Sequence, residues 1–174
     1  MVHVVLEKRK NKVIEIKKHR IIKIEQIKLA EALIHVAVIS LILITFAYFY
    51  SSNRFIGLIL IGLGFLPLIS LKLAKHKIKE TISEIVFGIA NTGLVTLFAL
   101  FGFKIIGIFG AIIGVAIGDS ITEGFSGILE GEVAEILKRY KIREKINPLN
   151  SSLGKMAGAL FGGGIVLLLF SITS

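Results

Sequence analysis

The stretch LGKMAGALFGGGIVLLLFSI, at residues 153–172, decides the fold class of this chain. Lys155 is its only charged residue. A helix rises about 1.5 Å per residue, so a helix of this length crosses the ~30 Å hydrocarbon core of a bilayer. We therefore expect this stretch to form a transmembrane helix.

Comparable apolar runs occur through most of the chain. Its 174 residues are 54% hydrophobic, and its mean hydropathy is +0.83, whereas soluble domains are roughly 45–50% apolar. The sequence therefore predicts an all-α integral membrane protein with about five transmembrane helices. The expected helices lie at residues 29–50, 56–74, 82–101, 105–121 and 153–172.

The second apolar run is the least regular of the five. It contains Gly57, Gly62, Gly64 and Pro67. Proline and glycine inside a helix predict a kink or a break. The sequence leaves open whether this segment spans the membrane or is re-entrant.

The basic residues indicate how the helices are oriented. Of the 21 Lys and Arg residues, nine precede the first apolar run, four follow the second and six follow the fourth, while only Arg54 and Lys104 lie in the other loops. Cytosolic loops of membrane proteins are enriched in Lys and Arg. We therefore expect a multi-pass protein of the cytoplasmic membrane, with its N-terminus in the cytosol and Ser174 outside.

Residues 1–28 form a basic cytosolic segment ahead of the membrane domain, which we assign to residues 29–174. Apolar and polar residues alternate on both sides of the polar run 8–12, a pattern typical of a short hairpin. An amphipathic interfacial segment is the alternative, because four isoleucines between residues 21 and 27 lie among lysines. The net charge of +9 does not indicate a nucleic-acid partner, because no aromatic residues are interleaved with the basic ones.

Glycines recur at every fourth position in the last two expected helices. Such stripes let another helix approach closely in a bilayer. They predict helix packing, either within one chain or between two copies. We expect the protein to be a homodimer. The residues before the last helix, Asn147, Pro148 and Asn150, are typical of a helix stop, with Ser151 or Ser152 as the cap of the next helix. The stripes are Gly110, Gly114 and Gly118, and Gly154, Gly158 and Gly162.

The motif GDSITE at residues 118–123 is the main candidate for function. Asp119 and Glu123 are four residues apart, which places both carboxylates on one helical face. Two acids in a bilayer repel each other unless a cation or a proton compensates them. Glu130 continues this face. The alternative is an interfacial acid cluster that pairs with Lys138 and Arg139.

The third expected helix supplies possible partners for these acids. Glu84 lies near its start, and Asn91 lies seven residues further on, at a depth comparable to that of Asp119. Carboxylate, amide and hydroxyl oxygens suit hard cations such as calcium, sodium or magnesium. A zinc or soft-metal site is not expected, because cysteine is absent and the histidines are scattered. The predicted cation ligands are Glu84, Asn91, Asp119, Thr122, Glu123 and Glu130.

From Phe87 onward, about half of the chain resembles the transmembrane protein 65 family. The matching stretches are FGIANT at 87–92, GDSITE at 118–123 and LGKMAG at 153–158. The family has Asp or Asn at the positions of Asn91 and Asp119 and an acid at that of Glu123, but it shows an Asp-Asn pair where this chain has Asn91 and Thr92. The resemblance implies a role in sodium-dependent calcium movement, as a transporter or as a partner of one.

Two weaker resemblances point elsewhere. GLVTLFAL at 93–100 and EGFSG at 123–127 are similar to vacuolar iron transporters, although the Asp and Met of those proteins are missing here. The Gly-Asp pair and the later Gly-rich helix loosely resemble polyprenol kinases, which act on membrane lipids. We expect a cation transporter or exchanger for sodium or calcium, with no enzymatic activity and no resident cofactor; an iron transporter and a structural or accessory membrane protein are the alternatives.

Overall fold

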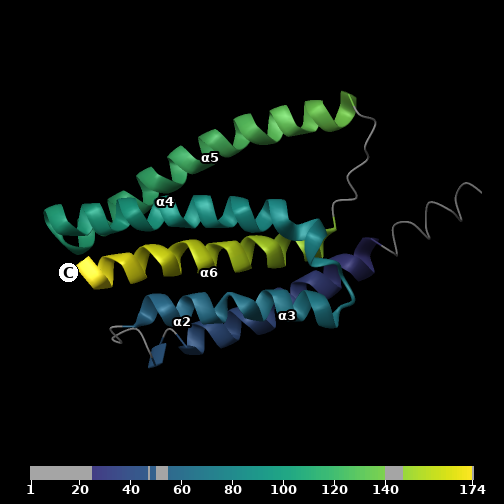
Figure 1. Cartoon of the computed structure of the whole chain (residues 1–174), viewed down its shortest axis with the longest axis horizontal. Coiled ribbons are helices and arrows are strands. Elements are labelled where there is room, and N and C mark those ends of the chain that lie inside the picture. Colours follow the sequence, from purple (N-terminus) through teal and green to yellow (C-terminus); the bar gives the residue numbers. More distant parts are fainter. Residues whose placement is uncertain (1–24, 47, 50–54, 140–146, 174) are drawn as a thin grey trace, which may run out of the picture.

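The computed structural model describes residues 25–46, 48–49, 55–139 and 147–173 (Figure 1). These residues contain helices and no strand, and five helical segments are long and apolar enough to span a membrane. The prediction of an all-α membrane protein with about five transmembrane helices is confirmed. The expected N-terminal hairpin lies outside the described residues. The helices are Glu25–Phe46, α2 (Ile56–Leu63), α3 (Phe65–Leu73), the short 3₁₀ helix η1 (Ile78–Thr81), α4 (Ile82–Ile106), α5 (Ile108–Arg139) and α6 (Pro148–Thr173).

Helix α6 lies at the centre of the bundle. It packs against α4 on one side and against α2 and α3 on the other (Figure 1). Helix α4 in turn lies between α6 and α5, and among α2 to α6 it is the only helix that α5 contacts extensively. The first helix joins the bundle at the start of α6, where Ala32 packs in one apolar cluster with Leu71 and Leu149.

Both glycine stripes face α4 of the same chain. A Cβ atom added to Gly110 or Gly114 would meet the backbone of α4 at Gly102 or Phe98, and one added to Gly158 would meet the carbonyl oxygen of Ile85. The stripes therefore allow α4 to contact a neighbour closely on two sides. A homodimer, which stays a prediction, must use a different surface.

The second apolar run continues through its glycine and proline residues. Helices α2 and α3 join at Gly64, where the ring of Phe161 would lie 2.6 Å from an added Cβ atom. Pro67 lies in the first turn of α3, where a helix leaves backbone N–H groups without partners, so the missing N–H is tolerated. The segment runs antiparallel to α6, from Gly57 beside Leu168 to Leu71 in the same cluster as Leu153. It therefore covers the same depth as α6, which supports the spanning alternative.

Several helix ends differ from the expected ones, and those at Gly107 and Asn147 have a clear local cause. A single residue, Gly107, joins α4 to α5 with φ 67°, a left-handed conformation that glycine adopts at little cost. The predicted helix stop at residues 147–150 and the serine cap are wrong. Helix α6 begins at Pro148, and Asn147 caps it through a hydrogen bond from the Leu149 N–H to its Oδ1 (3.1 Å). Asparagine is favoured as a cap and proline as the first helical residue.

Helix α5 is longer than a transmembrane segment requires. Its 32 residues span about 48 Å, against ~30 Å for the hydrocarbon core. It lies close to α4 near Gly107 and diverges from it towards its C-terminal end (Figure 1). We use "Gly107 end" for the end of the bundle where α4 meets α5, and "Asn147 end" for the opposite end, where α6 begins.

Candidate cation site

The motif GDSITE lies where α5 still packs against α4. Gly118 lies against Val95, 3.0 Å from an added Cβ atom to the Val95 Cα, and Thr122 is buried one turn further on. Because α4 and α5 are antiparallel, this register places Thr122 level with Asn91. The Thr122 hydroxyl lies 3.0 Å from the carbonyl oxygens of both Gly118 and Asp119, to which it can donate.

Asn91 carries an unusual buried oxygen at this level. Its Oδ1 is inaccessible to solvent and has no hydrogen-bond partner in the part of the chain that the structure describes. A buried acceptor without a donor costs about 1–3 kcal/mol. At the level of Thr122 the bundle therefore contains an acceptor that a cation, a water molecule or a proton donor would satisfy.

Asp119 and Glu123 lie about 100° around α5 from its glycine stripe. Gly118 and Thr122 are buried against α4, whereas Asp119 and Glu123, each one position further along the helix, are exposed. Neither acid forms an ion pair among the described side chains. The alternative pairing with Lys138 and Arg139 concerns side chains outside the described part, as does the predicted role of Glu130.

The depth of Asp119 makes its exposure significant. It follows Gly107 by 12 residues, about 18 Å along the helix, within a hydrocarbon core of ~30 Å. An aspartate near the centre of a transmembrane helix costs about 2.5–3.5 kcal/mol. Direct contact between this face of α5 and lipid is therefore unfavourable.

Glu84 is bonded to residues of α6. Ser151 Oγ donates to Glu84 Oε1 (3.1 Å), and Lys155 Nζ lies 3.9 Å from Glu84 Oε2 and 5.2 Å from the centre of the Phe87 ring. Glu84 is thus held by α6, and Asn91 lies about two helical turns further along α4, level with Thr122 of α5. Within the described residues, no three acidic or histidine side chains group as a metal site.

The partners of Glu84 were missed by the sequence analysis. Ser151 and Lys155 are one helical turn apart and therefore share a face of α6. A lone lysine in an apolar helix needs a counter-ion or an exposed end. That spacing, together with the single charge in residues 153–172, was the signal that could have identified them.

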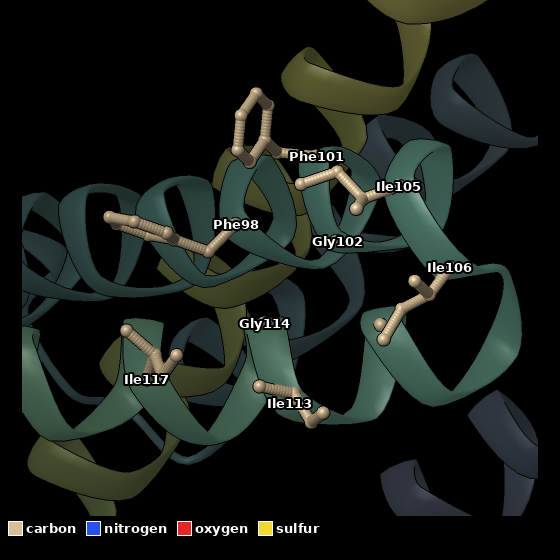
Figure 2. Close-up of a pocket in the computed structure, with 9 residues that line it drawn as sticks. Phe98, Phe101, Gly102, Ile105, Ile106, Ile113, Gly114 and Ile117 are labelled. Carbon is tan, nitrogen blue, oxygen red and sulfur yellow. The ribbon is translucent and has the colours of Figure 1, made fainter.

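An opening in the α4–α5 interface lies nearer the Gly107 end and is apolar. It is a groove of about 290 Å³, formed on α4 by Phe98 and its neighbours and on α5 by Ile113, Gly114 and Ile117 (Figure 2). All of its lining residues are Phe, Ile or Gly. The polar residues Asn91 and Thr122 lie beyond it, so one interface has an apolar part and a polar part.

The arrangement of these helices defines a multi-pass α-helical membrane protein. No family model, curated protein or solved structure matches this chain. The resemblances to the transmembrane protein 65 family and to vacuolar iron transporters therefore stay predictions.

Proposed function

We propose that the protein is a cation transporter or exchanger of the cytoplasmic membrane, and that the polar part of the α4–α5 interface contributes to the ion path. The observation that carries this proposal is the buried Oδ1 of Asn91, which has no donor among the described residues. Thr122 lies level with it, and Asp119 is one turn before Glu123 on the same helix. Oxygen ligands of this kind suit hard cations, and sodium and calcium are the ions that the transmembrane protein 65 resemblance implies.

The proposal includes a second copy of the chain and a cytosolic Asn147 end. Both glycine stripes are occupied by α4, so the uncovered face of α5 is the surface available for a homodimer. Asp119 and Glu123 lie on that face. A second copy would shield them from lipid and would bring their carboxylates close to a shared cation.

A structural or accessory membrane protein is the second candidate. The observation that favours it is the α4–α6 contact, where Lys155 already compensates Glu84 and the glycines serve packing. Such a protein would be equally stable with and without added cations.

The test is ion flux in proteoliposomes that contain the purified full chain. We expect uptake of calcium or sodium by the wild-type protein and its loss in Asp119→Asn. Glu25→Gln is the matched control, because Glu25 is an exposed acid at the start of the first helix. Normal flux in Asp119→Asn would remove Asp119 from the site. Absence of flux for every cation tested with wild-type protein would favour the structural candidate.

A further inference from the structure

His76 and Asn147 meet at the Asn147 end of the bundle in a contact that the proposed cation site does not use. His76 Nδ1 lies 3.3 Å from Asn147 Nδ2, and both side chains are partly buried. His76 follows α3, and Asn147 precedes α6. The contact therefore ties the segment after α3 to the start of the central helix.

The cap of α6 fixes which way the Asn147 amide points. Its Oδ1 already accepts the Leu149 N–H (3.1 Å), so its NH₂ group faces His76. Nδ2 of Asn147 must then donate to Nδ1 of His76. Only a neutral imidazole with its proton on Nε2 has an acceptor at Nδ1.

The backbone holds His76 in place on the other side of the contact. The His76 N–H donates to the Leu71 carbonyl (3.0 Å), and the Lys75 N–H donates to the Lys72 carbonyl (3.1 Å). Lys75 has φ 60°, so the end of α3 is a Schellman motif. The Asn147 amide therefore cannot turn over without releasing the Leu149 N–H, and the Schellman motif fixes the backbone from which the His76 side chain extends.

We propose that this contact is a pH-sensitive clamp on the start of α6. Protonation of His76 places an N–H at Nδ1, so that two donors face each other. Asn147 can offer its Oδ1 instead only by releasing the Leu149 N–H. The inference does not depend on cation transport.

Most of the described charged side chains on the elements that meet at the clamp are basic. Described cations outnumber described acids on the elements that meet here, and Glu84 is already bonded to Ser151 and Lys155. The charged and titratable side chains are Glu25, Lys28, Glu31 and His35 on the first helix, Lys72, Lys75, Lys77 and Lys79 from α3 to η1, Glu84 on α4 and Lys155 on α6.

If the clamp exists, the protein should lose stability on acidification. The folded contact requires neutral His76, so its contribution is present above the range in which histidine titrates and is lost as the pH falls through that range. In detergent or nanodiscs, the melting temperature of the full chain should fall between about pH 8 and about pH 5. The fall should exceed that of His76→Gln by about 2–4 °C, the shift expected for one hydrogen bond in a chain of this size.

His35→Gln is the matched control. His35 Nδ1 contacts the Glu31 carbonyl (2.8 Å), to which it can donate in either charge state, so this variant should keep the wild-type pH dependence. Asn147→Asp tests the direction of the effect. Its carboxylate can still accept the Leu149 N–H and attracts a charged His76, so acidification through the histidine range should now stabilise the protein. The clamp is refuted if His76→Gln and the wild type lose stability equally on acidification, or if Asn147→Asp responds as the wild type does.

Discussion

Helix α4 packs against α6 on one side and against α5 on the other, and the two interfaces are built differently. Towards α6, Gly154, Gly158 and Gly162 bring the helices into backbone contact along the Asn147 half of the bundle, and the charge of Glu84 is paired with Lys155. Towards α5, the close backbone contacts of Gly110 and Gly114 lie beside an apolar groove, and the unpaired Asn91 oxygen lies further towards the Asn147 end.

The difference shows where this molecule can change shape. Among the helices α2 to α6, α6 has extensive contacts with α2, α3 and α4, whereas α5 has extensive contacts with α4 alone. Within this set, movement of α5 therefore disturbs one extensive interface, and movement of α6 disturbs three. We therefore expect the α4–α6 contact to hold the bundle together. The α4–α5 contact is the one at which two helices can separate.

The largest effect is expected from filling the α4–α6 interface. Gly158→Val would place side-chain atoms against the Ile85 carbonyl and the Gly88 Cα, which are backbone atoms that cannot rotate aside. We expect a loss of about 3 kcal/mol or more in the free energy of unfolding, measured by denaturant titration in detergent. Gly62→Ala is the control, because nothing lies within 4 Å of its added Cβ atom. Equal effects of the two substitutions would contradict the close contact.

Replacing Asn91 tests the polar part of the α4–α5 interface. Saturation with a bound cation, at a hundredfold its dissociation constant, should stabilise the wild-type protein by about 2.7 kcal/mol. Asn91→Leu should remove this gain, while its stability without cations should stay equal or rise, because the unpaired oxygen is gone. Thermal melting with and without calcium or sodium measures both quantities. A cation-dependent shift that persists in Asn91→Leu would exclude Asn91 as a ligand.

Filling the α4–α5 interface should be less damaging than filling the α4–α6 interface. Gly114→Val would meet the Phe98 carbonyl, but α5 has no second large interface among α2 to α6 and can shift away from α4. We expect a loss of about 1–2 kcal/mol, at the lower end of overpacking effects, in the same denaturant titration. A loss as large as that of Gly158→Val would show that α5 is held as firmly as α6.

The sequence predicted the membrane helices well because each one needs a long apolar run. It also predicted that the glycine stripes pack against another helix, because small residues at every fourth position form a flat face that any helix can approach closely. The partner of that face could not be predicted, because these helices are apolar on nearly all sides and their periodicity does not show which side is buried. The two stripes therefore remained compatible with a dimer.

The candidate site was predicted only in part. The four-residue spacing predicted that Asp119 and Glu123 share one face of α5. It could not predict that this face is exposed, because that follows from the packing of Gly118 and Thr122 against α4. Glu84 was grouped with Asp119 because it lies on the same helix as Asn91, whose depth is comparable to that of Asp119, although the contacts of Glu84 lie on α6. The start of α6 was misplaced because Asn147 and Pro148 suit both a helix stop and a helix start.

The smallest effect is expected from the charge pair that distinguishes the α6 side of α4. The Glu84 and Lys155 side chains are 29% and 47% exposed, and their nearest atoms are 3.9 Å apart, so a double-mutant cycle with Glu84→Gln and Lys155→Gln should give a coupling of only about 0.2–1 kcal/mol. Thermal melting of the four proteins in detergent measures it, and Lys104→Gln, which removes a cation over the Phe170 ring instead, is the control that should show no coupling to Glu84. A coupling of several kcal/mol would mean that Glu84 and Lys155 are buried from solvent in the bilayer, and charge pairing rather than glycine packing would then hold α4 to α6.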